Sequence, residues 1–248
     1  MSWLSSPRGR DGAAIRLFAF PFAGGDVATF APWADELPRE IELCPVSLPG
    51  RGRRIGEPAH AHIEPLVKAV ADGLAPALGG RFALFGHSLG GLIAFELARE
   101  LRRRGGPRPA HLLISSRPAP QLPRRLTPLW NLPDDVFLRA LHERYGYTAP
   151  VDVGPIDELL ELMLPTVRSD VRISDEYAYQ GEPPLDIPIT TFGGLTDPTV
   201  SRDELAGWRQ QTTGPFEQRM LPGGHFYLTS EWRFLVRFVA NTLQQTLR

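Results

Sequence analysis

An apolar segment that runs directly into a Gly-x-Ser-x-Gly pattern constrains this chain more than any other feature. Residues 82–85 read Phe-Ala-Leu-Phe, and the pattern then spans Gly86 to Gly90 with Ser88 at its centre. Apolar residues at helical spacing follow at once, so the order is strand, sharp turn and helix. In that order the pattern is a nucleophile elbow, a tight turn that needs small neighbours and lifts the serine hydroxyl off the sheet. The segment therefore predicts Ser88 as an exposed nucleophile at the positive end of a helix.

Segments with the apolar pattern of strands alternate with helical segments along most of the chain. Strands are expected at 15–20, 43–48, 82–85, 111–115, 187–192 and 216–221. Helical patterns are expected at 30–37, at 63–78, directly after Ser88 and from about Ser230 onward. Such alternation predicts the α/β class, with a mostly parallel sheet flanked by helices on both faces. The length of 248 residues also suits a single α/β domain over 1–248.

The segment 118–184 departs from this alternation. It begins rich in proline and arginine and then carries helical patterns with no strand between them. A helix is expected to start near Pro133, because proline is favoured in the first turn and the acids that follow complement the helix dipole. Further helices are expected at 156–164 and 167–179. The insertion falls before the strand expected at 187–192. This position predicts a helical lid on the side of the elbow. The apolar residues that would line this lid, or only pack it onto the core, are Trp130, Leu138, Leu141, Leu160 and Met163.

His225 is the expected base that activates Ser88. A serine hydroxyl is a poor nucleophile until a base takes its proton, and with this kind of elbow the partners follow in the order serine, acid, histidine. His225 stands just after the last expected strand, and Gly223 and Gly224 before it allow the loop to return over the sheet. The remaining histidines lie in a loop, in the elbow, at the start of a strand or in the insertion, and they fit the role less well. They are His60, His62, His87, His111 and His142.

Asp197 is the expected acid that orients the histidine. It follows the strand at 187–192 and so lies at a strand's C-terminal end, where α/β active sites form. Pro198 favours an extended backbone at Asp197 and keeps it out of a helix. The alternative is a turn aspartate or a helix cap, but the pattern Ser201-x-x-Glu204 already supplies a capping box for the next helix. Two weaker candidates, one before the strand and one in the next helix, are Asp186 and Asp203.

Two backbone amides are expected to receive the negative charge that develops on the substrate's carbonyl oxygen during acyl transfer. One belongs to Leu89, the residue after the nucleophile. The other should come from the loop after the first strand, where Phe22-Ala23-Gly24-Gly25 permits a close approach of the backbone. Ala23 is the preferred second donor of this oxyanion hole, and Gly24 is the alternative.

The overall composition limits the partners, the cellular location and the cofactors expected for such a site. The net charge of −1 gives no indication of a nucleic-acid or membrane partner. Cys44 is the only cysteine, and the first residues lack the apolar core of a signal peptide, so a cytoplasmic protein is expected. No cofactor is implied, since no Gly-x-Gly-x-x-Gly or P-loop pattern occurs. No metal is expected either, because His60-x-His62 lacks the further ligands of a metal site. A monomer is expected, as no obvious exposed apolar strand remains.

Further motifs are spread over nearly the whole chain. They are Phe20-Pro21-Phe22-Ala23-Gly24-Gly25, Leu48-Pro49-Gly50-Arg51-Gly52-Arg53, Gly86-His87-Ser88-Leu89-Gly90-Gly91, the Leu-Pro-Asp-Asp that starts at Leu132, Leu164-Pro165-Thr166-Val167-Arg168-Ser169-Asp170, Gly193-Gly194-Leu195-Thr196-Asp197-Pro198 and Gly223-Gly224-His225-Phe226-Tyr227-Leu228. Together they resemble the type II thioesterases, the stand-alone editing hydrolases of polyketide and nonribosomal peptide synthesis, which have the α/β-hydrolase fold. The chain departs from many members at Phe22, where they have histidine or tyrosine, and at Leu89, where they have methionine. Neither change removes a backbone donor.

The resemblance implies a substrate and a partner. The substrate would be an acyl group held as a thioester on the phosphopantetheine arm of an acyl or peptidyl carrier protein. Ser88 would attack it, with His225 acting first as base and then as acid to the leaving thiolate, and with Asp197 orienting His225. Carrier proteins are acidic, so four arginines either dock them or are ordinary solvated side chains. These are Arg51, Arg53, Arg124 and Arg125.

Two other functions stay open from the sequence. The first is a general carboxylesterase or a product-releasing thioesterase on the same fold, because all of these enzymes share the three catalytic residue types. The second is a catalytically silent protein that binds carrier proteins, although such a module would have no need to retain Ser88, Asp197 and His225 together.

Overall fold

The computed structural model describes residues 3–4, 12–146 and 156–248. Within them the chain forms a six-stranded sheet in the order β2-β1-β3-β4-β5-β6, and each neighbouring pair of strands is parallel. The strands are β1 (Ile15–Phe20), β2 (Ile41–Pro45), β3 (Phe82–His87), β4 (His111–Ser115), β5 (Ile189–Gly194) and β6 (Phe216–Leu221). The predicted α/β class is confirmed. The strand expected at 43–48 begins earlier, at Ile41, because Ile41 already pairs with Ile15 of β1.

Helices follow most of the strands. They are α1 (Ile63–Leu74), α2 (Leu89–Arg103), α3 (Asp134–Tyr145), α4 (Ile156–Glu176), α5 (Arg202–Ala206), α6 (Tyr227–Ser230) and α7 (Trp232–Thr246), with the 3₁₀ segments η1 (Val27–Asp35), η2 (Gly52–Arg54), η3 (Ala75–Ala77) and η4 (Gly207–Gln211). The helix expected at 30–37 is in fact η1, which starts earlier because Asp26 caps it and which contains Pro32, a residue without an amide donor. Among the described helices, none combines the length and hydropathy needed to cross a membrane.

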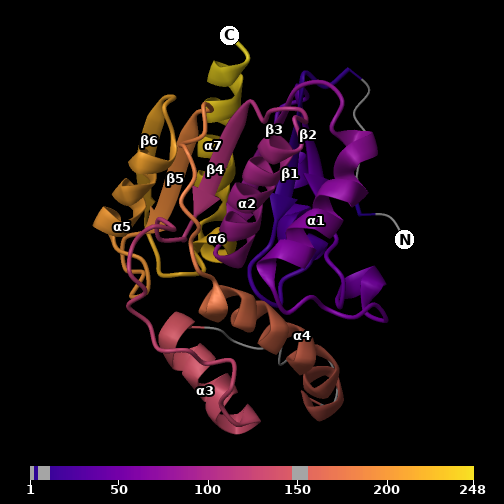
Figure 1. Ribbon diagram of the computed structural model, residues 1–248, viewed down its shortest axis with the longest axis vertical. Helices are drawn as coiled ribbons and strands as arrows, with labels where there is room; N and C mark the ends of the chain where they lie inside the picture. Colours follow the sequence, from indigo (N-terminus) through magenta and orange to yellow (C-terminus); the bar gives the residue numbers. More distant parts are fainter. Residues whose placement is uncertain (1–2, 5–11, 147–155) are drawn as a thin grey trace.

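The sheet is covered on both faces. Helices α1 and α2 lie on one face, and α7 lies on the other together with η1 (Figure 1). Side chains of β1 alternate between the two apolar cores, as the period of a strand requires: Phe18 and Phe20 pack with α2, whereas Leu17 and Ala19 pack with η1 and α7. This arrangement leaves the carboxyl ends of the strands open for a site, because only loops and the insertion cover them.

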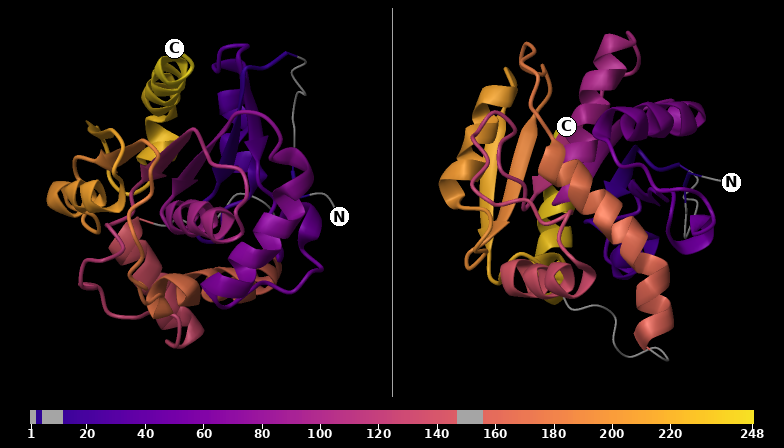
Figure 2. Two further views of the ribbon diagram at one scale, coloured as in Figure 1. Left: turned by 45° about the horizontal axis from the view of Figure 1, so that its top comes forward. Right: turned by 60° about the horizontal axis from the view of Figure 1, so that its bottom comes forward.

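Helices α3 and α4 come from the insertion between β4 and β5 and lie beyond the carboxyl ends of the strands (Figures 1 and 2). They share a small apolar core of their own, formed by Leu129, Phe137, Leu141, Val167 and Val171. Residues 147–155 of the expected lid 118–184 lie outside the described residues. The two helices therefore occupy the position expected for a lid, whose movement and function remain a prediction.

Helix α4 is one continuous helix, so the two separate helices expected at 156–164 and 167–179 are wrong. Pro165 lies inside α4 and removes one backbone hydrogen bond, which normally breaks or bends a helix. Side-chain contacts just after the proline hold the next turn in place. Thr166 Oγ1 donates to the carbonyl of Gly50 at 2.7 Å, and Asp170 is bound by Arg51. Tertiary contacts thus override the local preference for a break.

The elbow depends on close packing of backbone against backbone. A Cβ atom placed on Gly90 would lie 2.2 Å from the carbonyl oxygen of Phe20, and one placed on Gly86 would lie 2.0 Å from the carbonyl oxygen of Gly90. These atoms belong to main chain that is hydrogen-bonded in the sheet and helix, so they cannot move aside as a flexible side chain would. Glycine at both positions is therefore a steric requirement of the turn between β3 and α2.

Gly90→Ala is expected to lower the free energy of unfolding by about 3 kcal/mol or more, because the new methyl group overlaps the backbone of Phe20. Urea unfolding followed by circular dichroism measures the change. Gly56→Ala is the matched control, since a Cβ atom there meets nothing within 4 Å, and its effect should stay within about 0.5 kcal/mol. Equal stability of the two variants would contradict this account of the elbow.

Candidate active site

Ser88 stands alone between the end of β3 and the start of α2, in a strained backbone conformation. Its φ of 55° lies in the left-handed region that side chains with a Cβ avoid. The conformation is held because the Ser88 amide donates to the carbonyl of Ser115 on β4 at 2.7 Å. The hydroxyl is thereby presented at the amino end of α2, where unpaired amides carry a partial positive charge.

His225 and Asp197 meet Ser88 from two other loops. His225 Nε2 lies 3.1 Å from Ser88 Oγ, and His225 Nδ1 lies 2.9 Å from Asp197 Oδ2. His225 follows β6 and Asp197 follows β5, so parallel pairing of these strands with the rest of the sheet brings all three residues to its carboxyl edge. The side chains of His225 and Asp197 are 3% and 0% exposed, which excludes water from the contact between them.

Two further hydroxyl groups, neither of them on a site residue predicted from the sequence, bind Asp197. Thr199 donates to Asp197 Oδ1 from both its amide, at 2.8 Å, and its hydroxyl, at 2.7 Å, and the same hydroxyl lies 3.0 Å from His225 Nδ1. Ser116 donates to Asp197 Oδ2 at 3.1 Å. An aspartate whose side chain binds the amide two residues later is a common turn motif, so the Asp-Pro-Thr spacing was a local signal for Thr199. Ser116 comes from β4's end, and no local pattern indicates it.

These contacts keep Asp197 ionised. Burial by itself raises the pKa of the carboxyl group, but hydrogen bonds and charge from His225 and the two hydrogen bonds from Thr199 outweigh it and lower the pKa from 3.8 to about 2. The Ser201–Glu204 capping box forms as predicted, so α5 is capped without Asp197. The Asp197 carboxylate therefore binds His225, Thr199 and Ser116 and is not needed to cap α5.

Thr199→Val is expected to lower kcat about tenfold with little change in KM, because the variant removes a hydroxyl group that orients both Asp197 and His225 while the Thr199 amide bond to Asp197 remains. Steady-state kinetics on a thioester measures the split between kcat and KM. Thr213→Val, on an exposed loop, is the matched control and should leave both constants unchanged. A rise in KM alone would assign Thr199 to substrate binding instead.

The other five histidines do not contact the Ser88 hydroxyl. His87 is fully buried beside the elbow, where its Nδ1 is 2.8 Å from Ser115 Oγ, and burial, with the charge of His225, lowers its pKa to about 3. His111 on β4 is hydrogen-bonded to Thr190 on β5 and to Thr246 at the end of α7. His62 faces Glu176 on the surface, 3.7 Å away. Among the six histidines, His225 is therefore the one placed to take a proton from Ser88.

The amides expected to bind a developing oxyanion differ in their availability. Among the described residues, neither Leu89 nor Ala23 has a hydrogen-bond acceptor for its amide. The Gly24 amide, by contrast, donates to Asp170 Oδ2 on α4 at 2.8 Å. This contact argues against Gly24, the alternative donor, and favours Ala23 together with Leu89. The assignment of both donors stays a prediction.

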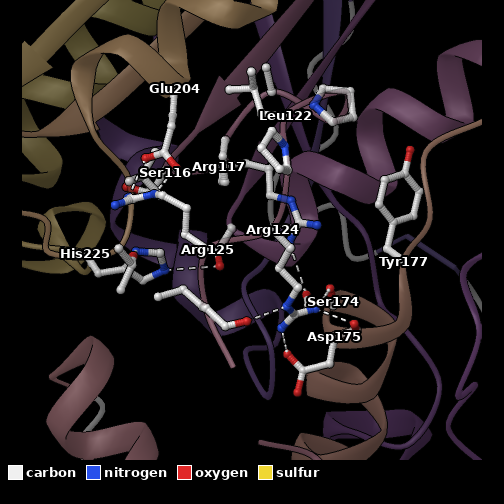
Figure 3. A pocket seen from close by; sticks show the side chains of 18 of the residues that line it. Ser116, Arg117, Leu122, Arg124, Arg125, Ser174, Asp175, Tyr177, Glu204 and His225 are labelled. Carbon is white, nitrogen blue, oxygen red and sulfur yellow. Dashed lines mark hydrogen bonds and ion pairs between the residues drawn. The ribbon is translucent and has the colours of Figure 1, made fainter. Parts of the chain in front are cut away.

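Two pockets meet at Ser88 and His225. The larger, of about 800 Å³ including space open to solvent, has apolar side chains such as Leu122 in its wall beside the polar Ser116, Arg117, Arg124 and Arg125 (Figure 3). It is the more polar of the two and is called the polar pocket below. The smaller, of about 470 Å³, has an apolar wall formed by Phe22, Ala23, Leu141, Val167, Val171 and Phe226. Tyr145, Ser174 and Asp175 border both pockets. A molecule whose two ends occupy these pockets would have its central part beside Ser88.

The residues expected to line the lid are distributed unevenly. Leu141 lines the apolar pocket, whereas Trp130 and Leu138 pack between α3 and α4. Met163 is partly buried on α4, and the side chain of Leu160 lies outside the described residues. Sequence alone identified the apolar positions of these helices but not which of them face Ser88.

Arg51 fits neither alternative left open for it, docking or an ordinary solvated side chain. Its side chain is buried and forms an ion pair with Asp170, so it has no surface to offer a partner. Arg124 binds Asp175, and Arg125 binds Glu204 at 2.6 Å, so both are already paired at the rim of the polar pocket (Figure 3). Arg53 is exposed. Docking by Arg53, Arg124 and Arg125 stays a prediction.

The geometry supports nucleophilic acyl transfer. His225 Nε2 can accept the Ser88 proton, and Asp197 holds the opposite ring nitrogen as a hydrogen-bond donor, which sets the tautomer that the reaction needs. The Leu89 amide, for which the described residues offer no acceptor, directly follows the nucleophile, and both pockets open onto Ser88. Among the described residues, no group of three or more histidine, cysteine or acidic side chains is placed to hold a metal ion.

Comparisons with known proteins point the same way. Residues 15–243 match the family model for the thioesterase domain. The linear gramicidin dehydrogenase LgrE of Brevibacillus parabrevis is 39% identical over 246 residues, which cover 99% of this chain and 94% of that protein. The gramicidin S biosynthesis protein GrsT of Aneurinibacillus migulanus is 36% identical over 245 residues, which cover 99% of this chain and 95% of that protein. Among solved structures, the type II thioesterase BorB from the borrelidin biosynthetic cluster is 32% identical, with a TM-score of 0.88 over 99% of this chain and 98% of that chain.

Proposed function

Since this chain belongs to the thioesterase family, we propose that it hydrolyses stalled or aberrant acyl groups from the phosphopantetheine arms of acyl or peptidyl carrier proteins. The observation that carries the proposal is the contact between Ser88 Oγ and His225 Nε2, 3.1 Å, at the junction of a polar and an apolar pocket. The likeness of the whole chain to type II thioesterases such as BorB adds the substrate class. The acyl or peptidyl carrier is then the macromolecular partner, and the enzyme acts on it as a monomer.

The reaction proceeds in two halves. Ser88 Oγ attacks the thioester carbon while His225 Nε2 takes the hydroxyl proton, and the amides of Ala23 and Leu89 bind the oxyanion. The carbon–sulfur bond then breaks, and His225 gives its proton to the departing thiolate. In the second half, water attacks the acyl-serine carbon as His225 takes a proton from it. The bond between that carbon and Ser88 Oγ then breaks, the carboxylic acid leaves, and His225 returns the proton to Ser88 Oγ. Asp197 stays ionised throughout and stabilises the charged imidazole.

The two pockets divide the substrate between them. The apolar pocket beside Phe22, Leu141 and Val171 suits the acyl chain, because burial of methylene groups there is favourable. The polar pocket suits the pantetheine arm, whose amide groups need hydrogen-bond partners, and Arg117 and Ser174 lie in its wall (Figure 3). The acyl chain and the arm would then leave the thioester carbonyl between them, next to Ser88.

Other functions are less well supported. A general carboxylesterase or a product-releasing thioesterase would use the same three residues, and only substrate preference separates them. A silent carrier-binding module would not need a nucleophile, a base and an acid in contact. The name of LgrE refers to a dehydrogenase, but this chain has no Gly-x-Gly-x-x-Gly pattern for a dinucleotide.

The deciding experiment compares one acyl group in three forms: on a phosphopantetheinylated carrier protein, on a small thiol and as a simple ester. We expect kcat/KM to be at least about tenfold higher on the carrier, because carrier and arm add binding energy that the small substrates lack. Equal or faster turnover of the simple ester would leave a general esterase. A serine-directed phosphonate should also label Ser88, and failure to label it would favour the silent binder.

A further inference from the structure

A buried ion pair joins the insertion to the body of the protein. Arg51 Nη1 and Nη2 donate to the two carboxylate oxygens of Asp170, at 2.6 and 2.8 Å, in a fork geometry. Arg51 belongs to the loop after β2 and Asp170 to α4, and their side chains are 6% and 1% exposed. The two-point contact fixes both the distance and the angle between the loop and the helix, because the guanidinium and the carboxylate are planar.

The same carboxylate binds the loop that carries the expected oxyanion donor. Asp170 Oδ2 accepts a hydrogen bond from the Gly24 amide at 2.8 Å, and Arg51 Nη1 also approaches the Gly25 carbonyl at 3.3 Å. The Gly24 amide lies in the peptide plane that joins Ala23 to Gly24. Because the hydrogen bond to Asp170 fixes the orientation of this plane, it limits the backbone angles of Ala23. Ala23 lies in the wall of the apolar pocket together with Ser88. Asp170 is thus one residue removed from a donor to the reacting carbonyl oxygen.

Stability alone does not account for this arrangement. Replacing a buried ion pair by apolar side chains of similar volume is often neutral or stabilising, because the desolvation of two charges offsets their attraction. Apolar side chains could therefore join α4 to the loop after β2. They could not accept a hydrogen bond from the Gly24 amide. An ionised acceptor gives that amide a short and strongly directional bond, which is what positioning of a donor requires.

We propose that Arg51 and Asp170 form a positioning pair that holds the Gly24 peptide and thereby sets the Ala23 amide for the oxyanion. The inference rests on the proposed acyl-transfer function. It also couples the insertion to catalysis, since the acceptor for the Gly24 amide comes from α4 and is in place only when α4 is seated on the loop. Arg51 holds the carboxylate, and neither side chain touches the substrate.

Asp170→Asn tests the proposal. The variant keeps the shape of the side chain but places an amide donor against the donors of Arg51. Three quantities are measured on purified, full-length protein. They are kcat/KM on an acyl thioester, the inhibition constant of a trifluoromethyl ketone bearing the same acyl chain, and the dissociation constant of the corresponding pantetheine thioether. The ketone forms a tetrahedral adduct with the serine and uses the oxyanion donors, whereas the thioether has no carbonyl group and does not.

We expect kcat/KM and the affinity for the ketone to fall together, by about 10- to 100-fold, because loss of one whole donor costs about 10²–10³. Binding of the thioether should stay within about twofold, a pattern that a purely structural role would not give. Glu57→Gln is the matched control. It breaks an Arg–carboxylate fork between Arg54 and Glu57 in the same loop. Among the described residues this fork shares no hydrogen bond or ion pair with the Gly24 loop, so the variant should change none of the three quantities.

Arg51→Lys provides a second test of the proposal if Asp170→Asn does not fold. It keeps the positive charge but loses the fork, and it should reduce kcat/KM and ketone affinity in parallel by a smaller factor. The proposal is overturned if a folded variant binds the ketone as tightly as the wild type does, or if thioether binding falls by the same factor. Failure of the wild type on carrier thioesters would overturn the proposed function alone. The comparison of ketone and thioether would still decide the role of the pair, because it needs only the serine and its donors.

Discussion

Ser88→Ala is expected to reduce turnover of a carrier-bound thioester by about 10⁴–10⁶-fold, because it removes the oxygen atom that attacks the carbonyl carbon under the proposed function. His225 Nε2 then has no hydroxyl group at 3.1 Å to deprotonate. The rate that remains would come from the oxyanion donors and from substrate orientation, which act on water as a weak substitute nucleophile. Single-turnover hydrolysis, followed by loss of the acyl group from the carrier, measures so large a change directly.

The Ser88→Ala variant should otherwise resemble the wild type. Alanine has a Cβ atom as serine does, so the strain of the φ of 55° remains and stability should change by less than about 1 kcal/mol. Affinity for an acyl carrier protein with a non-hydrolysable linkage should also persist. Ser230→Ala, at the exposed end of α6, is the matched control and should keep full activity. Residual turnover above about a hundredth of the wild-type rate would mean that Ser88 is not the nucleophile.

Asp197→Asn is expected to lower kcat by about 10³–10⁴-fold although the shape of the side chain is unchanged. An asparagine amide can donate a hydrogen bond to His225 Nδ1, which would place the ring proton on Nε2, where it can no longer accept the Ser88 proton. The variant also lacks the negative charge of Asp197 that stabilises the imidazolium in the transition state. The measurement is kcat at saturating thioester. Asp186→Asn and Asp203→Asn, at the two weaker acid candidates, are the controls and should stay within about twofold of the wild type.

The same substitution has an effect on stability with a defined pH range. The pKa of Asp197 is lowered on folding from 3.8 to about 2, so its charge stabilises the folded state fully above pH 3.8 and loses that effect as the pH falls through about 2. A shift of this size corresponds to about 2 kcal/mol. The free-energy difference between wild type and Asp197→Asn, measured by urea unfolding, should therefore shrink by about that amount between pH 5 and pH 2. A difference that does not depend on pH would contradict the lowered pKa.

The pKa of Asp197 also bears on catalysis. An acid with a pKa of about 2 stays ionised across the pH range in which an enzyme of this kind can work. Protonation of Asp197 is therefore not expected to limit activity above about pH 4.

Local sequence was a good guide to the elements that carry the site. The boundaries of β1, β4 and β6 agree with the strands predicted at 15–20, 111–115 and 216–221. Strand β4 is buried on both faces and reads as a nearly continuous apolar run, whereas β6 is an edge strand in which Glu217 and Arg219 are exposed. Local sequence was a poorer guide to the insertion. There, Pro165 suggested a break that contacts from Gly50 and Arg51 prevent.

By itself, the sequence determined the elbow at Ser88, the α/β class and the candidates His225 and Asp197, since glycine spacing and apolar periodicity act within a few residues and are written in consecutive positions. Tertiary structure alone decided which amide beside the nucleophile is already bound, and that Arg51 is a buried partner of α4. Arg51 and Asp170 lie 119 positions apart, and Ser116 and Asp197 lie 81 positions apart. Contacts of that kind depend on how the sheet brings distant loops to one edge, and no local pattern encodes them.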